Sequence, residues 1–253
     1  NLINSIQPTH IYLTHMHWDH YHGPSLRRLE KYKPQILLPK HFNRRMKRDL
    51  LKDFNFSNIK ELDHGKKYKI REEFILASYQ FNPIILDSSL VIEVDGVTLL
   101  NSNDCKTFGL SLRHLINNHP RIDFSFRSHS SATPIPHCVK DMEVEESDRT
   151  PSDYADDFIA FAKATKSKYV VPFASSHIYL HKLTKKFNRY YSDPSFIKRQ
   201  FDLKRNSAQE CKVMVSGSSW SKYNGFNIKH HNFSNLESDI KKYSLKNHLK
   251  LKK

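Results

Sequence analysis

Three histidines and an aspartate crowd into one short segment near the N-terminus, directly after an apolar run. The segment is Thr-His-Met-His-Trp-Asp-His at positions 14–20. Before it, Ile11–Leu13 is typical of a buried strand, and after it Gly23-Pro24 is typical of a helix start. A strand that ends in such a loop and turns into a helix needs a sheet beside it and a helix layer over it. The segment therefore favours a layered α/β fold.

The spacing of the four side chains predicts metal binding. Alternate residues of an extended chain point the same way, so His15 and His17 should face one point. Asp19 and His20 follow at the turn into the helix and can face a second point nearby. Imidazole and carboxylate ligands suit zinc, with iron, manganese or nickel as alternatives. We therefore expect one or two ions at this loop.

Short apolar strands alternate with helical stretches along the rest of the chain. Asp95-Gly96, between apolar runs at 90–94 and 97–100, is the strongest hairpin signal. Thr150-Pro151-Ser152-Asp153 predicts the start of a helix that ends near Ala164. The other expected strands cover 36–38, 74–80, 169–173 and 212–215, and the other expected helices cover 41–54, 110–116 and 195–208.

Composition excludes several classes of protein. The 253 residues include 16 Phe and 12 Tyr, which is too much core material for a disordered chain. No apolar run is long enough to span a bilayer, and no secretory signal is visible. The three cysteines form no Cys-x-x-Cys pair, so we expect no disulfide framework and a reducing, cytoplasmic location.

The charge balance points to an anionic partner. Lys and Arg number 41 against 26 Asp and Glu, a formal charge of +15. This excess favours a phosphate, a carboxylate, a nucleic acid or an acidic membrane surface, although lysines scattered over the surface and a basic tail at about 230–253 explain much of it. The expected partner is a small anionic substrate. No nucleic-acid-binding module is recognised, so nucleic acid is not an expected partner. The sequence carries no signal for the oligomeric state.

The pattern His15-x-His17-x-Asp19-His20 after an apolar strand resembles the signature of the metallo-β-lactamase superfamily. The resemblance implies one domain over 1–253, with a four-layer αβ/βα sandwich and a metal centre at a loop edge. It implies that Asp104, which follows the strand at 97–100, is a bridging carboxylate. It also implies that His177, just past the strand at 169–173, is a late ligand.

The sequence lacks one metal ligand that the family resemblance leads us to expect. The family carries a further histidine before the hairpin, and residues 77–83 contain none. The position shared by His15 and His17 therefore lacks a ligand or borrows one of three others, namely Gln80, Asn82 or Asp87. The other position looks complete, with Asp19, His20, Asp104 and His177. We expect one firmly held ion and a weak or absent second.

The family resemblance also leads to expectations about the N-terminus and about which group within the superfamily this chain is most similar to. The family places one or two hairpins before the histidine cluster, and only eight residues precede Thr9 here. Either the chain lacks its natural beginning or the sheet lacks its N-terminal strands. Asp87-Ser88-Ser89 and Asn103-Asp104-Cys105 are similar to phrases in one group of the superfamily. That group includes ascorbate-6-phosphate lactonase, the N-acyl-phosphatidylethanolamine phospholipase D type and CMP-N-acetylneuraminate hydroxylase.

The function that the resemblance implies is hydrolysis of a phosphodiester, a lactone or a related anionic substrate. Asp19 is the expected catalytic residue, because it can orient a water or take its proton. Four residues near the ends of the motifs are candidates for substrate binding, and they could equally be ordinary solvent-exposed side chains. They are Lys106, Arg127, His129 and His181.

Two other functions stay open. The fold can serve as the substrate-binding, hydrolase-like part of a Rieske-type nucleotide-sugar hydroxylase. The chain itself has no Cys-x-His pair for a Rieske centre. It can also be a non-catalytic sandwich that binds an anionic glycan or nucleotide.

Overall fold

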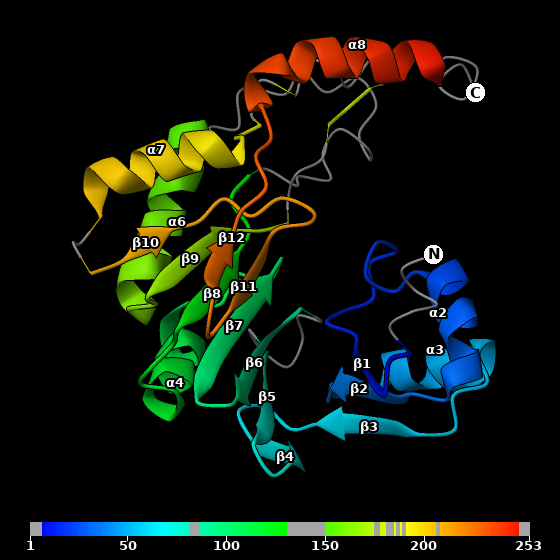
Figure 1. The fold of residues 1–253 in the computed structure, drawn as a ribbon. Helices are drawn as coiled ribbons and strands as arrows, with labels where there is room; N and C mark the ends of the chain where they lie inside the picture. The colour runs from blue at the N-terminus through cyan, green and yellow to red at the C-terminus, as the bar shows by residue number, and fades with distance from the viewer. Residues whose placement is uncertain are drawn as a thin grey trace. The chain divides into compact units, whose positions relative to one another are not determined.

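The computed structural model describes residues 7–80, 87–130, 150–174, 178–180, 185, 188, 191–205 and 208–247. The chain divides into two compact units, Asn1–Asp123 and Phe124–Lys253. Figure 1 colours them blue to green and green to red. The single domain expected from the sequence stays a prediction. Within the described residues, no helix combines the length and the apolar content needed to span a bilayer.

The first unit begins with a parallel sheet covered by two helices. Strands β1 (His10–Tyr12), β2 (Gln35–Pro39) and β3 (Ile59–Leu62) pair in that order. Helix α2 (Gly23–Leu29) connects β1 to β2 through the short 3-10 helix η1 (Glu30–Tyr32), and α3 (Arg45–Asp53) connects β2 to β3 (Figure 1). The helices and the sheet bury a common apolar core: Leu13, Leu26, Ile36, Leu38, Met46, Leu50, Phe54 and Phe56.

An antiparallel sheet packs on the other face of β2. Its strands are β4 (Lys67–Arg71), β5 (Phe74–Gln80), β6 (Ser88–Val94) and β7 (Val97–Asn103), each paired with the next. Because side chains alternate along a strand, Leu37 of β2 points away from Ile36 and Leu38. It packs with Leu62, Leu76 and Leu90 between the two sheets.

Helix α4 (Gly109–Asn118) forms the outer layer on this side. Leu76 and Tyr79 lie on opposite faces of β5, and the Tyr79 ring contacts the His114 ring of α4 at 5.7 Å between centroids. The first unit thus has four layers, with helices outside and two sheets inside. This arrangement confirms the α/β fold class expected from the sequence.

The second unit is built around a short parallel sheet. Strands β8 (Phe124–Arg127), β9 (Tyr169–Pro172) and β10 (Glu210–Cys211) pair with β9 in the centre. Helices α6 (Pro151–Thr165) and α7 (Pro194–Lys204) cover one face, where Phe158 and Phe201 pack with Val170 of β9.

The other face of this sheet is covered by an aromatic hairpin, β11 (Ser219–Ser221) and β12 (Gly225–Asn227). Its Trp220 ring lies 4.8 Å from the Phe124 ring, and its Phe226 ring lies 4.8 Å from the Tyr169 ring. The 3-10 helix η3 (Phe233–Asn235) and helix α8 (Leu236–Lys246) follow.

Most expected elements are present, and the differences have local causes. The hairpin at Asp95-Gly96 is confirmed, with φ of 49° and 73° at its two central residues, as a tight two-residue turn requires. The strand expected at 212–215 is wrong. The pairing with Tyr169 and Val170 of β9 ends after Cys211, although β9 itself continues to Pro172.

Two other boundaries also differ from expectation. The helix expected over 41–54 begins at Arg45, because Arg44 before it takes a left-handed conformation with φ of 47°. The helix expected over 195–208 ends at Lys204. The basic stretch expected as a tail contains α8.

The start of α6 gives a stability prediction. The Thr150 hydroxyl accepts a hydrogen bond from the Asp153 amide, and the Asp153 carboxylate accepts one from the Thr150 amide at 2.6 Å. Replacing Thr150 by alanine removes half of this capping box. We expect the free energy of unfolding to fall by about 1 kcal/mol. Urea unfolding followed by circular dichroism measures it, and Thr150→Ser should retain the wild-type value. An unchanged value in the alanine variant would show that this cap contributes nothing.

Candidate metal centre

The loop between β1 and α2 is held in place at both ends. At its start, the Leu13 amide donates to the Leu37 carbonyl at 3.0 Å, and the Ser88 hydroxyl donates to the Thr14 carbonyl at 2.7 Å. Further on, the amides of His20 and Tyr21 both donate to the His17 carbonyl, which closes a turn. The loop therefore presents its histidines from a fixed backbone.

Two groups of potential ligands share one imidazole. His15, His20 and Asp104 form the first group, and the ligand atoms within it lie within 4.8 Å of one another. Nε2 of His20 is 3.1 Å from Oδ2 of Asp104, and Nε2 of His15 is 4.0 Å from the same oxygen. Two ligands of one zinc ion are separated by at most about twice the bond length of about 2.0–2.2 Å. The first group fits one ion.

The second group consists of His15, His17 and Asp87. Nε2 of His15 lies 2.9 Å from Nδ1 of His17 and 3.9 Å from Oδ1 of Asp87. Of the three substitute ligands considered for this position, Asp87 is the one placed here. The Gln80 side-chain amide instead donates to the Lys40 carbonyl at 3.0 Å, and Asn82 lies outside the described residues.

Thr14 orients two of the imidazoles. Its Oγ1 lies 3.0 Å from Nδ1 of His15 and 3.1 Å from Nδ1 of His20. A hydroxyl oxygen has two lone pairs, so it can accept a hydrogen bond from both rings. In that tautomer each Nε2 is unprotonated and available to a metal ion, which is how outer hydrogen bonds prepare histidine ligands. The sequence gives no signal for this role beyond the position of Thr14 directly before the cluster.

Asp104 is positioned by the residue before it. Asn103 ends β7 with a left-handed φ of 39°, and its side-chain oxygen accepts from the Asp104 amide at 2.7 Å. The same side chain donates to the Ser88 carbonyl at 2.9 Å. Ser88 also holds the histidine loop through Thr14, so it links the two stretches of chain that supply the first group.

Electrostatics favour the ligand forms of Asp104 and His15. The hydrogen bond from His20 lowers the pKa of Asp104, so this carboxylate is ionised at neutral pH. The same hydrogen bond raises the pKa of His20 and favours its protonated ring, so a metal ion bound at Nε2 would replace that proton. Burial lowers the pKa of His15, against an opposing effect of the Asp87 carboxylate. His15, which is only 1% exposed, is therefore neutral and able to bind a metal.

The remaining predicted site residues lie in several environments. Asp19 is about half exposed, and its Oδ2 is 3.5 Å from Nε2 of His20. Lys106 is exposed beyond β7. Arg127 of β8 is buried, with its guanidinium 4.4 Å from the centre of the Phe161 ring. His129 is buried in the second unit. The predicted ligand His177 and the predicted substrate contact His181 lie outside the described residues.

His129 gives a pH prediction. Burial lowers its pKa to about 4, so the folded chain resists protonation of this ring while the unfolded chain takes up a proton near pH 6.5. Stability should therefore fall as the pH drops below about 6.5. From pH 7 to pH 5, His129 should account for a loss of about 2 kcal/mol. Urea unfolding of the wild type and of His129→Gln at both pH values measures this difference, since the other histidines contribute equally to both proteins. Equal losses in the two proteins would contradict it.

Comparison with known proteins identifies the fold. The chain has the metallo-β-lactamase fold, as the resemblance implied. It matches a variant of the CmlA beta-hydroxylase with a TM-score of 0.55 and 13% identity, over 81% of this chain and 43% of that one. It matches the metallo-beta-lactamase fold protein YhfI from Bacillus subtilis with a TM-score of 0.53 and 11% identity, over 83% of this chain and 75% of that one. This chain thus spans less than half the length of the hydroxylase. No protein-family model and no curated protein matches the sequence.

Proposed function

We propose that this chain is a metal-dependent hydrolase that acts on a small anionic substrate in the cytoplasm. The observation that carries the proposal is the pair of ligand groups that share His15. One group uses His20 and Asp104, and the other uses His17 and Asp87. Zinc is the proposed ion, with His177 as a further ligand. A zinc ion at such a site supplies Lewis-acid activation of water and of the electrophilic oxygen of a substrate.

The side chains of the chain divide the remaining tasks. Thr14 fixes the tautomers of His15 and His20, and the ionised Asp104 neutralises charge at the first group. Asp19 lies next to His20 with about half of its side chain exposed. Its Oδ2 is thus in reach of solvent and of the first group, where it can accept the proton released by the attacking nucleophile.

Substrate contacts are proposed at Lys106, Arg127, His129 and His181. Of the three that the structure describes, Lys106 is the one exposed to solvent. An ammonium group there can bind the anionic part of a phosphodiester or of a phosphorylated lactone.

The unequal first and second groups support one firmly held ion and one weaker ion. In the first group, His20 and Asp104 are both half-buried and lie 3.1 Å apart. In the second group, in contrast, His17 is exposed to solvent.

A hydrolysis assay tests the proposal. The purified chain is stripped with a chelator, reloaded with zinc, and offered bis(p-nitrophenyl) phosphate and a phosphorylated sugar lactone. We expect turnover of one of them that is lost on stripping and restored on reloading. Equal turnover by the stripped protein, or no turnover of either substrate by the zinc-loaded protein, would contradict hydrolysis.

A second candidate function is participation in an oxygenation reaction, as the substrate-binding part of a larger hydroxylase. The likeness to the CmlA beta-hydroxylase, of which this chain spans 43%, favours it. Iron in place of zinc in the purified protein, together with a lack of hydrolytic turnover, would support this candidate over the hydrolase.

A further inference from the structure

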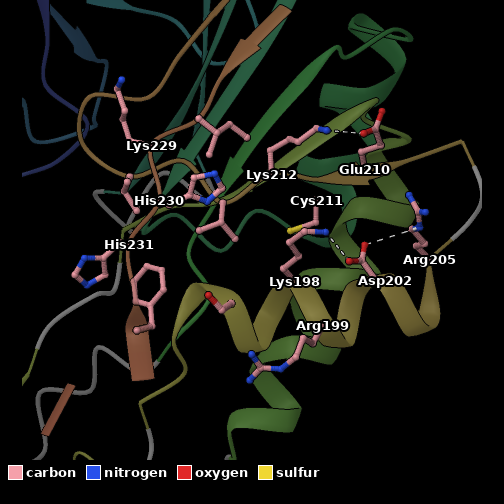
Figure 2. A pocket seen from close by; sticks show the side chains of 15 residues that line it. Lys198, Arg199, Asp202, Arg205, Glu210, Cys211, Lys212, Lys229, His230 and His231 are labelled. Carbon is pink, nitrogen blue, oxygen red and sulfur yellow. Dashed lines mark hydrogen bonds and ion pairs between the residues drawn. The ribbon is translucent and has the colours of Figure 1, made fainter. Parts of the chain in front are cut away.

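The second unit contains a pocket of about 690 Å³ that the proposed hydrolase chemistry does not use (Figure 2). Its volume is in the range of about 300–1,000 Å³ that is typical of small-molecule sites. Three segments form its walls: α7, the chain from β10 to residue 215, and residues 228–233 after the hairpin. The lining includes charged and apolar side chains, among them Lys198, Arg199, Lys212, Val215, Lys229 and Phe233.

The charges in the lining do not cancel. Five Lys and Arg side chains face two carboxylates. Each carboxylate already has a close partner, because Lys198 contacts Asp202 at 2.5 Å and Lys212 contacts Glu210 at 2.6 Å. Figure 2 marks both pairs with dashed lines. A net positive charge therefore remains in the lining.

Arg205 also contacts Asp202, at 3.9 Å, so Arg199 and Lys229 supply most of the excess. Arg199 lies on α7, and Lys229 lies on the segment after the hairpin. Both side chains are exposed, and among the described residues no carboxylate lies within ion-pair distance of either one. A guanidinium binds phosphate or carboxylate with two parallel hydrogen bonds, and an ammonium adds a point charge.

The rest of the lining is apolar. Val213, Val215, Ile228 and Phe233 are half-buried and line the same pocket as the cations. A solvated basic surface needs no such concave apolar wall, since its lysines extend into water. Apolar walls with a few charged groups are typical of sites that enclose the body of a ligand and fix one charged end.

We propose that this pocket binds an anionic small molecule with an apolar or aromatic body. Its phosphate or carboxylate contacts Arg199 or Lys229, and its body packs on Val213, Val215 and Phe233. The assignment goes beyond the proposed hydrolase function, because it rests on residues of the second unit alone.

Fluorescence titration of the whole chain tests the assignment with two matched probes. Anilinonaphthalene sulfonate carries an aromatic body and a negative charge, whereas N-phenylnaphthylamine has the same body without the charge. The pocket variant combines Arg199→Gln and Lys229→Gln. The control variant combines Arg28→Gln and Lys246→Gln, which removes the same charges from exposed positions outside the pocket.

We expect the pocket variant to bind the sulfonate about tenfold more weakly than the wild type, equivalent to about 1.4 kcal/mol. The control variant should stay within about twofold of the wild type, and the uncharged probe should bind all three proteins equally. Equal affinity of the sulfonate for the pocket and control variants would overturn the assignment. The assignment would also be overturned if the pocket variant bound the uncharged probe about tenfold more weakly than the wild type. The loss of sulfonate binding would then not be due to charge.

Displacement of the sulfonate identifies the anion. Displacement by adenosine monophosphate and not by adenosine supports a phosphate ligand, and displacement by octanoate and not by octanol supports a carboxylate ligand. Displacement by neither anion would overturn the proposed ligand class. Metal removal should leave all of these results unchanged, so a failed hydrolysis assay and a failed binding assay are distinguishable.

Discussion

Replacing Asp104 by asparagine should abolish high-affinity metal binding and metal-dependent turnover. The change removes the negative charge that lies 3.1 Å from Nε2 of His20 and keeps the size of the side chain. Removing a residue that only hydrogen-bonds to a metal ligand lowers metal affinity by about 10–100-fold. Removing the charged ligand itself should therefore lower it by at least about 100-fold. Competition with a chromophoric chelator measures the affinity for zinc.

The matched control is Asp53→Asn, which removes one exposed carboxylate at the end of α3. It should bind zinc with wild-type affinity. Both variants should fold, because neither carboxylate is part of the apolar core, and Asp104→Asn should unfold at a somewhat lower urea concentration, since it loses the charged contact with His20. Wild-type zinc affinity in Asp104→Asn would exclude this carboxylate as a ligand.

Replacing Thr14 by valine should weaken zinc binding by about 10–100-fold. Valine has nearly the shape of threonine but cannot accept the two hydrogen bonds from Nδ1 of His15 and of His20. Each ring is then free to rotate or to protonate Nε2, which removes it from the set of ligands. The same chelator competition measures the effect.

A second Thr–His pair in the chain provides the control. The Thr9 hydroxyl lies 3.0 Å from Nδ1 of His10, which is the same local contact at an exposed position outside both ligand groups. Thr9→Val should leave zinc affinity unchanged. If Thr14→Val also binds zinc as the wild type does, the imidazoles are oriented by other means and the assigned role of Thr14 is wrong.

The local parts of the site could be predicted from the sequence. His15, His17 and His20 are close in the chain, so the strand before them and the helix after them are enough to bring them together. Asp104 follows a hairpin whose turn residues fix the register of β6 and β7. The structure places this carboxylate 3.1 Å from His20, and its role as a metal ligand stays a prediction.

The choice of Asp87 could not be made from the sequence. It depends on the register between β5 and β6, in which Gln80 faces Ser88. It also depends on the hydrogen bond from Ser88 to Thr14, which connects two distant parts of the chain. No local pattern encodes these long-range pairings, so Gln80 and Asn82 were equally acceptable candidates.

In the second unit, too, locally encoded elements could be predicted from the sequence, whereas elements set by long-range contacts could not. The capping box at Thr150 predicted the start of α6 within one residue, because the signal lies in four consecutive residues. The strand expected at 212–215 is wrong, because β10 pairs with β9 through Glu210 and Cys211, a long-range register that the local apolar pattern does not encode. The hairpin of β11 and β12 was not predicted at all. Its stability comes from contacts of Trp220 and Phe226 with rings on β8 and β9.

The most direct test of the account is to locate the metal ion. Crystals of the zinc-loaded chain, measured at the zinc absorption edge, give an anomalous difference map. We predict a strong peak about 2.0–2.2 Å from Nε2 of His20 and from the Asp104 carboxylate. A weaker second peak is expected beside His17 and Asp87. A map whose zinc peaks lie away from His20 and Asp104, or that contains none, would contradict a metal centre formed by these residues.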